Sequence, residues 1–147
     1  MDARTFSIDL FDRWTQLWNL DFHLAADLLA PELKLHYAQS GSEAFDAVKT
    51  PEQLLHAIRH WHDLKPGIQF EVEGEPCVDA VQSGDSYTGM IARPYNVCIV
   101  NADNEDVWRS GTDILKFRDG LICEVWSVSS GRDGRSFRQH LAFNAAG

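Results

Sequence analysis

The stretch from Gly111 to Trp126 constrains the fold of this chain more than any other part of the sequence. Two apolar runs flank Asp119 and Gly120. Asp-Gly is a strong signal for a β-hairpin, because glycine tolerates the positive φ that the turn needs. Both runs alternate between apolar and polar residues, as strands with one buried face do. The sequence therefore predicts an antiparallel hairpin near the end of the chain.

Asp113 departs from this alternation. It shares a strand face with Leu115 and Phe117, because residues two apart along a strand point to the same side. A carboxylate on an apolar face lies either at a sheet edge, where water reaches it, or in a pocket, where burial raises its pKa. A plainer interpretation is that it only accepts hydrogen bonds from nearby backbone or from a tryptophan.

Size and composition fit one globular domain, which we expect to span residues 1–147 with the tail 131–147 partly mobile. The chain has a formal net charge of −9, which argues against nucleic acid and against an anionic membrane surface as partners. No apolar run approaches the ~20 residues that a spanning helix needs, and the N-terminus shows no signal-peptide pattern. The three cysteines form no disulfide or metal motif, so we expect a cytoplasmic protein.

The first half of the chain has the periodicity of helices. Apolar residues recur at three- and four-residue spacing from about Ser7 to Leu20, with Ser7 as the expected N-cap. A shorter helix is expected over residues 22–29. Thr50 and Gln53 form a capping-box signature, which predicts the start of a third helix.

The second half alternates as strands do. Pro94 interrupts this pattern and predicts an edge, a bulge or a bend. Strands are expected near residues 68–72, 77–81, 87–93 and 97–100, followed by the terminal hairpin. Helices followed by strands predict an α+β fold. We expect a cone-like α+β barrel, with the N-terminal helices packed on the concave face of a curved, mainly antiparallel sheet that leaves an apolar interior.

This order of elements resembles the nuclear transport factor 2-like superfamily, and within it the SnoaL-like and ketosteroid-isomerase-like small-molecule branch. The resemblance covers roughly Ile8 to Ser130. Its best anchors are the terminal hairpin and the junction from Leu28 to Leu33. The resemblance implies a fold more than a reaction, because this fold hosts isomerases, dehydratases, polyketide cyclases and non-enzymatic binders.

The resemblance carries over to some catalytic positions and not to others. Asp113 matches the acid that ketosteroid isomerases use to donate to an oxyanion, whereas Tyr37 stands where their base would be and Trp14 where their tyrosine would be. Steroid isomerisation is therefore not expected. Limonene-epoxide-hydrolase-like members have an acidic residue near the position that Ser127 occupies here. This chain lacks that acid, so epoxide hydrolysis is not expected either. SnoaL-like cyclases use an acidic residue in the cavity, and Asp113 is the candidate for it.

These considerations give a candidate site. Asp113 would be the acid or base, and Tyr37 its hydrogen-bonding partner. Residues expected to contact the ligand are Trp14, Trp18, Trp61, Leu115, Phe117, Val125 and Ser127. His56 and His60 are four residues apart on a helix and have metal-ligand spacing, but a solvated helix face explains them better. No metal or cofactor is expected.

Two functions are consistent with this sequence. The first is a cofactor-independent enzyme, such as an isomerase, cyclase or dehydratase, that acts on a small apolar or aromatic carbonyl compound by proton transfer. The second is a non-catalytic ligand-binding or dimer-scaffolding protein of the same fold. In either case the outer sheet face, with Ile122, Trp126 and Val128, is expected to form a homodimer interface.

Overall fold

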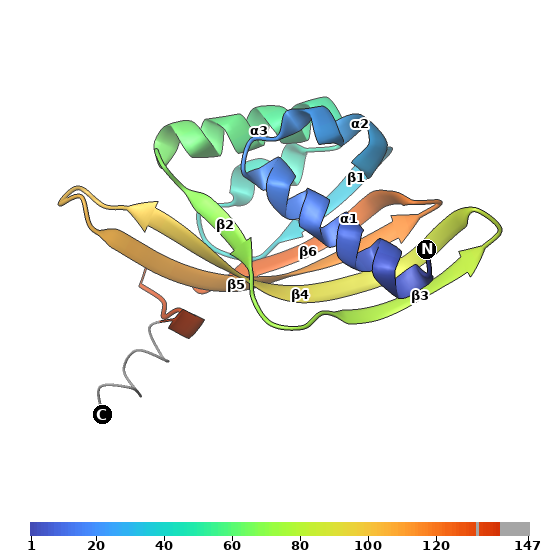
Figure 1. Cartoon of the computed structure of the whole chain (residues 1–147). Coiled ribbons are helices and arrows are strands. Elements are labelled where there is room, and N and C mark those ends of the chain that lie inside the picture. Colours follow the sequence, from blue (N-terminus) through green and yellow to red (C-terminus); the bar gives the residue numbers. More distant parts are fainter. Residues whose placement is uncertain (132, 139–147) are drawn as a thin grey trace.

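The computed structural model describes residues 1–131 and 133–138 of the chain. Within these residues, helices pack on one face of a curved six-stranded sheet, and the sheet is not closed into a barrel (Figure 1). The α-helices are α1 (Ala3–Trp18), α2 (Ala25–Leu28) and α3 (Pro51–Leu64). The strands are β1 (Leu29–Tyr37), β2 (Gln69–Val72), β3 (Cys77–Ser83), β4 (Ser86–Val100), β5 (Asp106–Arg118) and β6 (Leu121–Ser129). The predicted α+β class is confirmed.

The sheet has the order β1-β6-β5-β4-β2, and β3 also pairs with β4. The β1–β6 pair is parallel and the others are antiparallel. The predicted hairpin joins β5 to β6 through Asp119 and Gly120, whose φ angles are 51° and 80°. A two-residue type I′ turn needs a positive φ at both positions. No helix in the described residues has both the length and the apolar character required to cross a bilayer.

The observed start of the first helix differs from the start expected from the sequence. The first helix begins at Ala3, and Asp2 caps it by accepting a hydrogen bond from the backbone N–H of Thr5 over 2.7 Å. Ser7 lies inside that helix and donates its hydroxyl to the carbonyl of Ala3. The predicted capping box of Thr50 is present at the start of α3. Residues 22–28 form a 3₁₀ turn and the short α2, and Leu29 already begins β1.

Pro94 does not interrupt its strand as predicted, because β4 continues through it. The carbonyl of Pro94 accepts a hydrogen bond from the N–H of Glu73. In a strand the nitrogen and the carbonyl of one residue point to the same side, so the ring nitrogen of Pro94 points toward β2 and β3 as well. The residue lies between the segment of β4 that pairs with β3 and the segment that pairs with β2. No neighbouring strand needs a backbone N–H donor from β4 at this position, so a proline is tolerated there.

Ile122 points inward, which corrects the predicted outer face of β6. The β5–β6 register pairs Phe117 with Ile122 and Lys116 with Glu124, which leaves Cys123 as the extra residue of a bulge. A bulge shifts the alternation of side chains by one residue. Ile122 is therefore fully buried in the core, whereas Val128 is 52% exposed on the outer face.

The core lies between the helices and the concave face of the sheet. One face of α1 packs against the concave face of the sheet, and α3 covers its other part (Figure 1). The fully buried large side chains include Leu10, Phe11, Trp14 and Leu17 from α1 and Ile91, Leu115 and Phe117 from the sheet. Most residues of the tail 131–147, which is expected to be partly mobile, lie outside the described residues. Of the described ones, Ser136 is buried against the chain.

Candidate functional site

A cavity of about 600 Å³ opens between the helices and the concave face of the sheet. Its walls come from α1, β1, the 3₁₀ turn at Glu43–Ala47, α3 and strands β2, β4, β5 and β6. The lining includes eight aromatic side chains: Phe11, Trp14, Trp18, Tyr37, Phe45, Trp61, Phe70 and Tyr95. A mostly apolar cavity with a few polar groups is typical of a small-molecule site.

Asp113 lies in the wall of this cavity, where β5 pairs with Ser127 of β6. The residue is only 8% exposed. Its Oδ2 accepts a hydrogen bond of 2.9 Å from the indole nitrogen of Trp14, whereas Oδ1 is buried and has no partner with hydrogen-bond geometry in the described residues. Burial raises the pKa of the carboxyl group, while the Ser127 hydroxyl and the Trp14 indole act in the opposite direction.

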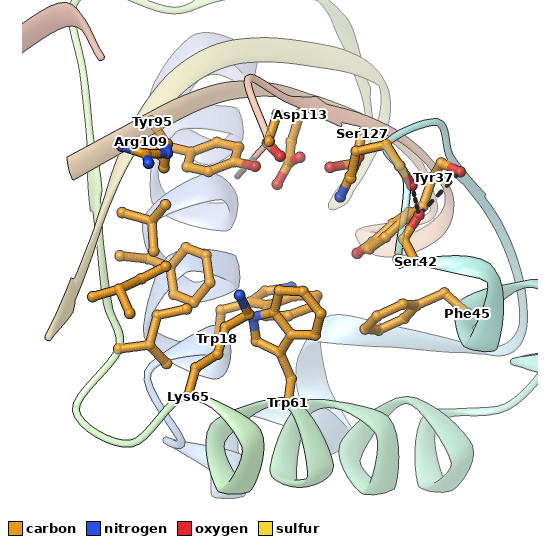
Figure 2. A pocket seen from close by; sticks show the side chains of 18 of the residues that line it. Trp18, Tyr37, Ser42, Phe45, Trp61, Lys65, Tyr95, Arg109, Asp113 and Ser127 are labelled. Carbon is orange, nitrogen blue, oxygen red and sulfur yellow. Dashed lines mark hydrogen bonds between the residues drawn. The ribbon is translucent and has the colours of Figure 1, made fainter. Parts of the chain in front are cut away.

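Two tyrosines flank Asp113. Figure 2 shows Tyr95 and Tyr37 entering from opposite sides, with Asp113 and Ser127 between them. Register explains this arrangement, because Asp113, Ser127 and Tyr37 lie in one row across β5, β6 and β1. Burial first, and then the charge of Asp113, raises the pKa of both tyrosines. Both phenols therefore stay neutral and act as hydrogen-bond donors at neutral pH.

Aromatic contacts give the cavity a fixed shape on the helix side. Trp18 packs against Tyr37, Phe45 and Phe70 with ring centroids 6.2, 5.7 and 5.4 Å away. The indole nitrogen of Trp18 and Oε1 of Gln39 are buried without a hydrogen-bond partner in the described residues. Both residues line the cavity, as Asp113 does. A buried polar atom without a partner is costly, so unpaired groups around one cavity support a ligand with matching polar groups.

Two cationic side chains also line the cavity. The ammonium of Lys65 lies 4.9 Å from the ring centroid of Trp61. Arg109 donates a hydrogen bond of 2.8 Å to the carbonyl of Trp108. The cavity therefore combines one carboxylate with positive charges, and the latter favour oxygen-rich groups on a ligand.

The structure brings most of the predicted site residues together. Cavity-lining residues among them are Asp113, Tyr37, Trp14, Trp18, Trp61 and Ser127. Leu115, Phe117 and Val125 are not among the lining residues, and the expectation that they contact a ligand stays a prediction. All three are fully buried in the core that the sheet forms with α1.

Tyr95 is the main residue that sequence reasoning missed. It lies next to Pro94, and the expected strand break removed it from the predicted sheet. Its signal is the alternation of Ile91, Tyr95 and Val97, which share one side of an uninterrupted strand. All three are buried.

In the described residues, no three His, Cys, Asp or Glu side chains gather closely enough to hold a metal ion. His62, near the end of α3, donates to the carbonyl of Trp18 over 2.6 Å. His36 lies on the outer face, hydrogen-bonded to Glu124 over 2.7 Å and stacked on Trp126. These histidines have structural partners.

Comparison with solved structures places the fold. The chain superimposes on IdmH of Streptomyces antibioticus, provisionally assigned as a polyketide cyclase, with a TM-score of 0.63, 18% identity and coverage of 84% of this chain and 91% of IdmH. The chain has the nuclear transport factor 2-like fold. A SnoaL-like protein from Jannaschia, also provisionally assigned as a polyketide cyclase, gives a TM-score of 0.62 at 12% identity, with 88% of each chain covered.

A third neighbour is a protein of the SnoaL-like family from Agrobacterium tumefaciens, provisionally assigned as an isomerase. It gives a TM-score of 0.61 at 16% identity and covers 86% of this chain and 99% of its own. Two of these three neighbours are named SnoaL-like, and all three share the fold of this chain. No protein-family profile matches the sequence, and no curated protein sequence matches it.

Proposed function

We propose that this protein is a cofactor-independent enzyme that performs acid–base chemistry on a small aromatic carbonyl compound held in the cavity. The observation that carries this proposal is the buried carboxylate of Asp113, which faces the cavity with Oδ1 unpaired in the described residues. A carboxyl group whose pKa is raised by burial is suited to take and return a proton near neutral pH. The aromatic wall fits a flat apolar ligand.

The chemistry requires few parts. Asp113 takes a proton from a carbon next to a carbonyl group, and the electron pair of the broken C–H bond moves into the carbonyl to form an enolate. In an isomerisation, Asp113 returns the proton to another carbon. In a cyclisation, the enolate carbon bonds to a second carbonyl carbon, whose oxygen then takes the proton from Asp113. Tyr37 holds a polar group of the ligand by a hydrogen bond. The names of the structural neighbours support this class of reaction.

Proton abstraction can be tested without the natural substrate. The probe is α-tetralone, a bicyclic aryl ketone, whose α-protons exchange slowly in deuterium oxide. We expect the protein to accelerate loss of the α-proton signal in NMR spectra. Asp113→Asn should slow this exchange by about 10²–10⁴-fold while α-tetralone still binds. Binding of the ketone without accelerated exchange would instead support the alternative function, a non-catalytic ligand-binding or scaffolding protein.

The proposal includes a homodimer formed through the outer sheet face. A shallow groove of about 430 Å³ lies there, lined by residues of β1, β5 and β6 that include Ile114, Trp126 and Val128. Exposed apolar side chains on a sheet face favour a partner. A second copy of the chain would bury the same patch on both subunits by two-fold symmetry.

A further inference from the structure

The ring of Tyr95 occupies the space that a side chain at position 111 would need. Tyr95 and Gly111 are directly opposite each other in β4 and β5. A Cβ atom on Gly111 would lie 2.5 Å from the hydroxyl oxygen of Tyr95 and 2.7 Å from its Cζ, and real Cβ atoms essentially never come so close. Gly111 does not have a positive φ, so glycine is required here for space and not for an unusual backbone conformation.

This space lets the Tyr95 ring cross β5 toward β6. Gly111 pairs with Ser129 in β6, and Ser127 lies two residues away on the same side. The hydroxyls of both serines lower the pKa of Tyr95, against the larger effects of burial and of the charge on Asp113. The phenol of Tyr95 lies in the cavity wall, where a ligand oxygen can accept a hydrogen bond from it.

We propose that Tyr95 is a second catalytic residue, which donates a hydrogen bond to the ligand oxygen that becomes negative when Asp113 removes a proton. Gly111 is its positioning residue, because it leaves room for the ring. This inference rests on the proposed function. The step moves no further proton, since the phenol keeps its hydrogen and only stabilises the enolate oxygen.

Tyr95 is favoured over Tyr37 for this role by its place in the sheet, because it is 8% exposed and lies on an inner strand. Tyr37 also packs against aromatic rings, but it lies on the edge strand β1. The Tyr95 ring packs against Phe70 with a centroid distance of 6.0 Å, and it shares a buried cluster with Ile68 and Val97. A donor held rigidly away from water stabilises a developing charge more than an exposed one.

The first test is kinetic and uses the third tyrosine of the chain as a matched control. Tyr95→Phe removes one hydroxyl, and we expect it to slow α-tetralone deuterium exchange by about 10²–10³-fold. Tyr87→Phe removes a hydroxyl that donates to the Met1 carbonyl and lies outside the cavity lining, so its exchange rate should equal that of the wild type. A Tyr95→Phe protein that exchanges as fast as the wild type would overturn the inference while leaving the proposed function intact.

The second test reports the hydrogen bond itself. The ¹³C resonance of α-tetralone labelled at its carbonyl should move downfield on binding to the wild type and to Tyr87→Phe, but not to Tyr95→Phe. Asp113→Asn should keep this shift, so the hydrogen bond from Tyr95 is tested separately from proton removal by Asp113. Gly111→Ala should lose the shift as Tyr95→Phe does. Its new Cβ would also lie 2.6 Å from the carbonyl oxygen of Val128, so Tyr95→Phe decides if that variant does not fold. A wild-type protein that binds no labelled ketone at millimolar concentration contradicts both proposals.

Discussion

The indole nitrogen of Trp14 donates a 2.9 Å hydrogen bond to Oδ2 of Asp113, from a helix at the start of the chain to a strand 99 positions later. This bond uses the one donor of the indole. Trp14 therefore orients the carboxylate and is not available to hydrogen-bond a ligand carbonyl. The bond also leaves Oδ1 as the carboxylate atom that lacks a partner in the described residues.

The first prediction concerns pH and stability. Because burial raises the pKa of Asp113 above its value in the unfolded chain, the folded state binds this proton more tightly than the unfolded state. The contribution of Asp113 to stability is therefore fully present below the ordinary carboxyl pKa of ~4 and is lost as pH rises through the folded-state pKa. Asp113→Asn should melt at a higher temperature than the wild type at pH 8, and this advantage should vanish in acid.

Calorimetry at several pH values measures this difference, and an NMR titration of the Asp113 carboxyl gives the pKa directly. Asp119→Asn is a suitable control, since Asp119 is exposed in the hairpin turn. A titration midpoint at or below ~4 would contradict the prediction.

The second prediction concerns Trp14. Trp14→Phe keeps an aromatic ring but removes the donor to Asp113, so we expect a loss of about 1.5–3 kcal/mol in the free energy of unfolding at neutral pH. The pKa of Asp113 should rise further, because the indole lowers it. Trp14→Ala should lose about 3–5 kcal/mol through the cavity it leaves. Trp61→Phe, at a half-buried site of the same cavity, is the control and should change stability by less than about 1 kcal/mol. Equal losses at both positions would show that the hydrogen bond contributes nothing.

Local chemistry explains which parts of the fold the sequence could predict. The turn at Asp119 and Gly120 and the capping box at Thr50 each depend on residues close together in the chain, and both are present as expected. The position of Asp113 in the cavity wall was predictable for a similar reason, because a carboxylate on the apolar face of a strand lies either at a sheet edge or in a pocket.

The parts that could not be predicted depend on pairing between distant segments. Pro94 is tolerated inside β4 only because β2 and β3 leave a gap opposite its nitrogen, and no pattern within β4 encodes that gap. Leu115 and Phe117 follow the same alternation as Asp113, yet they are core residues because α1 fills the space above them. Alternation predicts on which side of the sheet a side chain lies, but it does not predict how far along that side the cavity extends.

The third prediction follows from the bulge at Cys123. Ile122 is fully buried, whereas Val128 is 52% exposed, although simple alternation places both on the same face. Ile122→Ala should lower the free energy of unfolding by about 2–5 kcal/mol. Val128→Ala should change it by no more than about 0.5 kcal/mol in the monomer. Urea denaturation of both variants tests this, and similar losses would mean that the two side chains share one environment.

The fourth prediction tests the outer face as a dimer interface. Trp126 stacks on His36 with a centroid distance of 5.2 Å and lines the shallow outer groove, so a partner subunit would bury an apolar surface around it. Trp126→Glu places a charge in that contact without touching the concave core. We expect the wild type to be a dimer at micromolar concentration and the variant to dissociate, because an unpaired charge in an apolar interface is costly.

The matched control is Val81→Glu. Val81 is 65% exposed on β3, away from the outer groove, so the same new charge there should leave the dimer intact. Size-exclusion chromatography with light scattering gives the mass of each protein, and circular dichroism checks that each one is folded. A monomeric wild type, or a Trp126→Glu protein that remains a dimer, would place the interface elsewhere or remove it. Loss of the dimer in both variants would point to net charge, which is already −9, and would count against a specific contact at Trp126.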